Sequence, residues 1–253
     1  MNKTNVMTFL NSIDEYNIPK TNELDKILFN IPHSSIYITD KTGYVIDPKN
    51  EIEKLTDWHV DKIFDVEGIT KLIFPYSRVF CDVERFEDDS MEIEGYGFFY
   101  TQTDDCELLR KDIDGIKNKV LEEYYKPYHK KLEEEVQNKL DNYDECLIVD
   151  CHTFSDKPFK RDIFQSNLRP DICLGTNSIH TPDYLKDNYY NYFEKEGYSV
   201  DIDYPYLGTI VPKKFIGNDK VKSILIEINR KLYLNNKKGF EKIKKIIKSL
   251  FTI

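Results

Sequence analysis

Short apolar runs alternate along the chain with longer segments in which apolar side chains recur at helical spacing. The apolar runs predict strands at 27–31, 70–74, 146–151, 171–174, 198–202 and 223–228. The periodic segments predict helices at 50–65, 112–142, 181–195 and 237–250. This alternation predicts an α/β fold, with a mixed, mostly parallel sheet flanked by helices. Because no repeat, low-complexity tract or linker interrupts it, we assign residues 1–253 to a single domain.

Two segments need a more specific interpretation. Pro127 lies within 112–142, so this segment is expected to be one long amphipathic helix or two helices broken near the proline. The segment 86–106 holds many acids, glycines and aromatic residues. It is predicted to be a long loop that covers a site.

The charge balance limits the classes of partner. The chain has 45 acidic and 36 basic residues, and its formal net charge is −9. Binding to nucleic acid or to an anionic membrane needs clustered basic side chains, so we expect neither partner. No apolar run has transmembrane length, and the amino-terminal sequence does not resemble a signal peptide.

The cysteines indicate the compartment. There are five, an odd number, and no CxxC pair occurs among them. Most lie in or beside predicted strands, where a free cysteine behaves as a small buried hydrophobe. This usage fits a reducing environment without a disulfide framework, and we expect a cytoplasmic protein.

Two histidines follow apolar strands and are candidate metal ligands. His33 comes after the strand at 27–31, and His152 comes after the strand at 146–151. Ligands of open α/β sheets bind at the carboxyl ends of strands. Asp150 lies two residues before His152, so it can orient the imidazole of a liganding histidine. The alternative for each histidine is a purely structural hydrogen bond.

The segment 57–61 offers a third ligand. On a helix, Asp57 and Asp61 share a face, whereas His59 points elsewhere. The simpler interpretation is a solvated helix face; the functional one makes Asp57 a carboxylate ligand. Two histidines and one carboxylate, with a fourth position open, are typical of catalytic zinc.

Glu227 is the candidate general base, because it is a lone acid in the apolar strand at 223–228. Burial of a carboxylate raises its pKa towards a range that suits proton transfer. The alternative is an ion pair with Arg230 or Lys231.

Arginines are the candidate groups for binding an anionic substrate. Arg78 and Arg85 flank a short apolar stretch, and arginine can hold a carboxylate through two hydrogen bonds. The alternative for both is an ion pair with a nearby acid of the same segment. Three arginines are weaker candidates for the same role: Arg110, Arg161 and Arg169.

Taken together, these segments resemble the N-formylglutamate amidohydrolase family. The matching pieces occur in the family's order and span most of the chain. They are Ile31-Pro-His-Ser34, Asp57-Trp-His-Val-Asp61, Ser77-Arg78 with Asp82 and Arg85, Pro127-Tyr-His129, Asp150-Cys-His152, Leu174-Gly-Thr176, Gly208-Thr-Ile-Val-Pro212 and the strand with Glu227.

The resemblance implies a fold like that of zinc carboxypeptidases and aspartoacylases, with one zinc ion (Zn2+) at the sheet. By motif position, the zinc ligands would be His33, Asp57 and His152. Glu227 would be the general base and acid. Arg78 and Arg85 would bind the carboxylates of a small acidic acyl amino acid.

The resemblance leaves three residues as additional groups near the metal or as alternative ligands: His59, Asp150 and His129. It also shows one departure, because the family usually has Asn-Arg where this chain has Glu84-Arg85. An acid at this position would repel a substrate carboxylate, so the departure argues against N-formylglutamate as the substrate but not against amide hydrolysis. Arg230 could supply part of the missing anion recognition.

The sequence therefore predicts a zinc-dependent hydrolase of a C–N amide bond in an N-formyl or N-acyl amino acid. Formate and glutamate would be the products if N-formylglutamate is the substrate. The first alternative is a metallo-carboxypeptidase or amidase that acts on a peptide or a cell-wall fragment. The second is a non-catalytic binding domain with a degenerate site.

Overall fold

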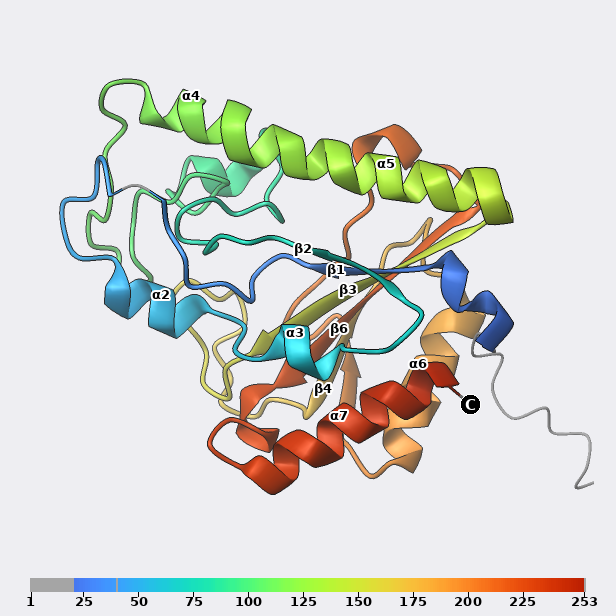
Figure 1. Ribbon diagram of the computed structural model, residues 1–253. Coiled ribbons are helices and arrows are strands. Elements are labelled where there is room, and N and C mark those ends of the chain that lie inside the picture. The colour runs from blue at the N-terminus through green and yellow to red at the C-terminus, as the bar shows by residue number, and fades with distance from the viewer. Residues whose placement is uncertain (1–20, 40, 253) are drawn as a thin grey trace, which may run out of the picture.

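A six-stranded mixed sheet lies at the centre of the protein (Figure 1). This computed structural model describes residues 21–39 and 41–252. The strands are β1 (Ile27–Ile31), β2 (Thr70–Ile73), β3 (Cys146–Phe154), β4 (Ile172–Gly175), β5 (Val200–Ile202) and β6 (Val221–Asn229), in the spatial order β2-β1-β3-β6-β4-β5. Neighbouring strands are parallel except for β4 and β6. The prediction of a mostly parallel, mixed sheet is confirmed.

Helices cover both faces of the sheet (Figure 1). One face packs against α4 (Ile116–Val120), a π-helical turn (Leu121–Tyr125) and α5 (Lys126–Tyr143). The other packs against α3 (Val60–Ile63), α6 (Asp183–Lys195) and α7 (Lys237–Thr252). The remaining helical segments are α2 (Lys49–Leu55), η1 (Thr21–Lys26), η2 (Ser90–Glu92), η4 (Lys213–Phe215) and η5 (Arg230–Leu232).

Side-chain alternation along the strands separates the two faces of the sheet. In β3, Val149 and Cys151 belong to the apolar core beneath α6 and α7, whereas Ile148 belongs to the core beneath α5. Successive strand residues point to opposite faces, so Asp150 and His152 lie on the α5 side. The register places His152 opposite Glu227 of β6. Polar residues therefore gather on one face, over the carboxyl-terminal halves of the central strands.

The prediction of one helix at 50–65 is wrong. The segment forms α2 and α3, and residues 56–59 break it. His59 has a φ of 64°, in the left-handed region, and starts α3. Asp57 lies within the break and is buried, and its main-chain amide donates to the carbonyl of His33 at 3.0 Å. Asp57 and Asp61 thus do not share a helix face.

Two central strands are longer than the sequence predicted. β3 continues to Phe154, so His152 lies inside this strand rather than beyond it, and β6 continues to Asn229, with Glu227 inside the strand as predicted. Apolar character alone placed the strand ends too early, because both strands continue through polar residues that the fold buries. The site therefore occupies a face of the sheet near its carboxyl edge.

The loop at 86–106 covers the polar region, as its composition predicted. Apart from η2 it has no helix or strand, and Phe86, Met91 and Tyr96 line a cavity over the sheet.

Within the described residues, no helix has both the length and the apolar character needed to cross a bilayer. The prediction that the amino-terminal sequence is not a signal peptide concerns residues 1–20, which lie outside the described residues.

Replacement of Gly175 tests the packing that places one wall of this cavity. A Cβ atom at Gly175 would overlap the carbonyl oxygen of Gly208, and it would lie 3.0 Å from the side chain of Leu225. We expect Gly175→Ala to lower the free energy of unfolding by about 1–3 kcal/mol, because backbone cannot move aside as a side-chain tip can. Urea denaturation measures this change, and an unaltered midpoint would contradict the assigned contact.

Candidate metal centre

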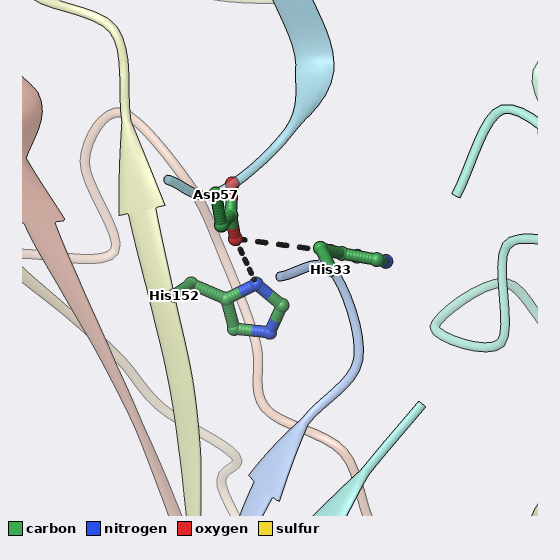
Figure 2. A group of neighbouring side chains, drawn as sticks. All are labelled: His33, Asp57 and His152. Carbon is green, nitrogen blue, oxygen red and sulfur yellow. Dashed lines mark hydrogen bonds and ion pairs between the residues drawn. The ribbon is translucent and has the colours of Figure 1, made fainter. Parts of the chain in front are cut away.

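Three buried side chains from separate segments meet at one point (Figure 2). His33 follows β1, Asp57 lies in the break between α2 and α3, and His152 lies in β3. Asp57 Oδ2 is 3.1 Å from His152 Nδ1 and 3.9 Å from His33 Nδ1. Their ligand atoms all lie within 4.8 Å of one another. The structure thus brings together the three residues that the sequence singled out as ligands.

Each imidazole is oriented by a second buried carboxylate. His33 Nε2 lies 2.8 Å from Asp82 Oδ1, and His152 Nε2 lies 3.0 Å from Asp150 Oδ1. In the neutral form of each ring, a proton on Nε2 donates to this carboxylate and leaves the Nδ1 lone pair directed at the shared centre. Metal-binding histidines have this arrangement, in which an outer acceptor fixes the tautomer and the ring orientation.

The protonation of the two histidines differs. Burial and the positive charge of Arg78 lower the pKa of His33 to about 4, so His33 is neutral at neutral pH. Burial also lowers the pKa of His152, but Asp150 and Asp57 outweigh it and raise this pKa well above its usual range. A cation placed among these carboxylates can therefore replace the proton on His152 Nδ1.

Asp57 is held as a carboxylate. Arg230 Nη2 donates to Asp57 Oδ1 at 2.9 Å, and the main-chain amide of Thr153 donates to Oδ2 at 3.3 Å. Burial raises the pKa of Asp57, but the hydrogen bond from His152 and the charge of Arg230 bring it down to about 2. The third potential ligand is therefore ionised at neutral pH.

The donor set fits a divalent metal ion. Two imidazole nitrogens and one carboxylate are the ligands of many catalytic zinc sites. Among the described residues, His33 Nδ1 has no hydrogen-bond partner although it is buried. A buried polar atom without a partner is costly, and a metal ion at the shared centre would remove that cost.

A second acidic group lies beside this centre. Glu84, Asp150 and His152 are also close enough to share an ion. However, the Asn30 side-chain amide donates to Glu84 at 2.7 Å and to Asp150 at 2.9 Å, and its own carbonyl accepts from Tyr128. A donor between two carboxylates takes the place that a cation would need, so this group is a hydrogen-bonded network.

The environment of Glu84 disfavours the negative charge that the sequence suggested at this position. Burial and the negative charge of Asp150 raise the pKa of Glu84 well above its usual range. Both effects favour the protonated carboxyl over the carboxylate, and a protonated Glu84 would not repel a substrate carboxylate.

Glu227 faces the cavity from β6 and is buried. Burial raises the pKa of Glu227 to about 8. Its Oε2 atom has no hydrogen-bond partner among the described residues. The alternative of an ion pair is not what the structure shows, because Arg230 pairs with Asp57, and Lys231 lies near Asp156 and Asp171. A buried acid with a free oxygen can accept and return a proton.

The three main candidates for substrate binding, Arg78, Arg85 and Arg230, line the cavity. Of the weaker candidates Arg161 lines it too, whereas Arg110 and Arg169 are not among its lining residues. Arg78 donates to Asp82 through Nε and Nη2, at 3.2 and 2.9 Å. Arg230 donates to Asp57, and Arg85 lies 3.7 Å from Asp89. Two of the three arginines thus hold acids of the centre itself. Their contact with a substrate stays a prediction.

Two predicted histidines are not brought to the centre. The exposed His59 packs beside Phe240 of α7, because the left-handed turn directs its ring outward. His129 of α5 packs against Tyr125, with a ring separation of 4.2 Å, and against Phe86 of the loop. Asp150, the third residue of this group, contacts His152 as described above.

Sequence reasoning gave no role in the centre to Asn30, Asp82 or Tyr100. Tyr100 donates to Asp82 Oδ2 at 2.7 Å, so Asp82 connects the loop, Arg78 and His33. The sequence placed Asp82 among the pieces that match the family and among the possible ion-pair partners of the nearby arginines, but it assigned Asp82 no contact with His33. One feature of the sequence pointed to Asn30, which is the only polar residue in the otherwise apolar strand β1.

Comparison with known proteins places the chain in a family. A family model described as N-formylglutamate amidohydrolase matches residues 25–234. An N-formylglutamate deformylase of Pseudomonas putida is 26% identical over 163 residues, covering 59% of this chain and 58% of that protein. An N-formylglutamate deformylase of Pseudomonas aeruginosa is 26% identical over 161 residues, covering 60% of this chain and 59% of that protein. The chain matches less than two thirds of the length of these relatives.

Solved structures show the same fold. The crystal structure of N-formylglutamate amidohydrolase from Ralstonia eutropha JMP134 has a TM-score of 0.79 and 22% identity, over 89% of this chain and 91% of that chain. The crystal structure of a gene product from Agrobacterium tumefaciens has a TM-score of 0.68 and 16% identity, over 89% of this chain and 87% of that chain. Together with the family model, which spans most of the sequence, these matches show that the chain belongs to the N-formylglutamate amidohydrolase family.

Proposed function

We propose that this protein is a zinc-dependent hydrolase of the amide bond in a small N-formyl or N-acyl amino acid such as N-formylglutamate. Formate and glutamate would be the products from that substrate. The observation that carries the proposal is the meeting of His33, Asp57 and His152 in one cavity with the unpaired Glu227. The names of the relatives supply the substrate class.

The residues divide the chemistry between them. His33, Asp57 and His152 would hold the metal. A zinc ion there would lower the pKa of a water molecule and polarise the amide carbonyl. Glu227 accepts a proton from the attacking water and then transfers it to the leaving amine. The raised pKa of Glu227, about 8, suits both steps at neutral pH.

The cavity favours a small substrate over a polypeptide. Its volume is about 580 Å³, within the range of roughly 300–1,000 Å³ that is usual for small-molecule sites. The loop at 86–106 forms one wall, and arginines lie among the lining residues. An amino-acid-sized anion would fit this volume, and the lining arginines would supply donors for its carboxylates.

Metal content tests the ligand set. We expect about one zinc per chain in the wild-type protein and a loss of most of that zinc in His152→Ala, because only two ligands remain. Atomic absorption after gel filtration measures both. His59→Asn is the matched control, since this histidine lies outside the centre and asparagine tolerates its left-handed φ. Full zinc in His152→Ala would remove this residue from the ligand set.

Replacement of the proposed base separates chemistry from metal binding. Glu227→Gln keeps the shape of the side chain but cannot take a proton. We expect kcat for deformylation of N-formylglutamate to fall by about 10²–10⁴-fold, with zinc content unchanged. Initial-rate kinetics and metal analysis on the same preparation give the comparison. Wild-type turnover in the variant would assign the base elsewhere.

The pH dependence of stability tests the buried state of Glu227 in metal-free protein. Its pKa rises from the ordinary 4.5 to about 8 on folding, so the folded state binds the extra proton. The stability that this proton contributes is present below pH 4.5 and is lost as the pH rises to 8. Glu227→Gln should therefore gain a few kcal/mol relative to wild type between these limits. Urea unfolding at both pH values measures the gain, and a pH-independent difference would contradict the burial.

A further inference from the structure

Arg161 occupies a distinctive place in the cavity wall. It lies on the long connection between β3 and β4 and lines the cavity together with the metal-binding cluster. Its guanidinium lies over two aromatic rings, 5.2 Å from the centroid of Tyr96 and 5.1 Å from that of Tyr100. Contact with aromatic faces holds a guanidinium in one orientation and leaves its N–H donors at the edge available.

The guanidinium of Arg161 has no assigned acceptor. Among the described residues it makes no hydrogen bond and no ion pair within 4.0 Å, and its Nη1 atom is buried without a partner. Arg78 and Arg230 donate to Asp82 and Asp57, which belong to the centre. Arg85 lies 3.7 Å from Asp89, and its Nε atom is also buried without a partner among the described residues, but no aromatic ring holds its guanidinium in the way that Tyr96 and Tyr100 hold that of Arg161.

The acid that feels the charge of Arg161 is Glu51. Burial raises the pKa of Glu51, and its hydrogen bond from the amide of Asp104 and the charge of Arg161 lower it in part. Glu51 Oε1 accepts from that amide at 2.8 Å, and among the described residues no hydrogen bond or ion pair within 4.0 Å joins Glu51 to Arg161. Glu51 is not among the residues that line the cavity, whereas Arg161 is. The donors of Arg161 are therefore available to an anion that enters the cavity.

Arg161 lies one layer of residues farther from the centre than Arg78 or Arg230. Arg230 contacts the potential ligand Asp57 directly, whereas Arg161 reaches His33 only through Tyr100 and Asp82. The α-carboxylate of an N-acyl amino acid is two bonds from the scissile nitrogen and must lie near the metal. The side-chain carboxylate of a glutamate-like substrate is two further bonds away from that nitrogen, so it would meet a cavity-lining arginine that does not hold an acid of the centre, such as Arg161.

We propose that Arg161 determines specificity by binding the side-chain carboxylate of an acidic N-acyl amino acid. The proposal rests on the hydrolase function above and deepens it, because it names the residue that selects an acidic over a neutral N-acyl amino acid. Wild-type protein should then hydrolyse N-formyl-L-glutamate faster than its neutral isostere N-formyl-L-glutamine.

The test compares both substrates in wild type, Arg161→Met, Arg161→Lys and Lys160→Met. Methionine fills the space between the two rings without a charge. Lys160 is the matched control, since it is the adjacent cation but is exposed and pairs with Asp105 outside the cavity. We expect Arg161→Met to lower kcat/KM for N-formyl-L-glutamate roughly 100-fold. For N-formyl-L-glutamine the change should stay within about threefold.

Arg161→Lys should recover part of the loss, because it keeps the charge but not the fork of donors. Lys160→Met should match wild type on both substrates. Equal losses on the two substrates in both Arg161 variants would reduce Arg161 to a structural role and overturn the proposal. Unchanged kinetics with N-formyl-L-glutamate would overturn it as well.

A binding measurement keeps the result separate from the proposed function. If wild-type protein hydrolyses neither substrate, the hydrolase proposal fails, and calorimetric titration with glutarate then decides the role of Arg161. Binding that is lost in Arg161→Met and retained in Lys160→Met would support an anion site at Arg161. Equal binding in all variants, or none in wild type, would overturn it.

Discussion

The Asp57 carboxylate is the point on which the site depends. One oxygen faces both histidines and the other accepts from Arg230, and all of these groups are buried. Removal of one partner from a buried charged network leaves an uncompensated charge, which is far costlier than the loss of one contact. The break between α2 and α3, the end of β1 and the length of β3 must therefore agree within a fraction of an ångström.

Sequence patterns were sufficient for the sheet and for the residues that meet in the centre. Periodicity located the strands, and His33, Asp57, His152 and Glu227 were recognised as polar residues at the ends of apolar segments. Apolar periodicity could not show that helix 50–65 is broken, since both halves keep helical spacing. The left-handed φ of the residue that starts α3 has no strong signal when that residue is not glycine.

The surrounding groups were harder to predict because their roles depend on contacts that are distant in the sequence. Asn30 joins Glu84 to Asp150, although it is separated from them by 54 and 120 residues. An acid at 84 suggested a negative charge, yet burial favours its neutral form. Pairings of this kind follow from strand order and register, which a single sequence does not determine.

The hydrogen bond from Tyr100 to Asp82 joins the cover of the cavity to its floor. Tyr100 belongs to the loop at 86–106, and Asp82 orients His33. A cation bound to His33 and an ordered loop then stabilise one another, and thermodynamic reciprocity makes the two effects equal. The affinity for a cation at this centre would consequently be a property of the loop as well as of the residues that would bind the ion. A relative with the same ligands and a different loop would bind the same metal with a different strength.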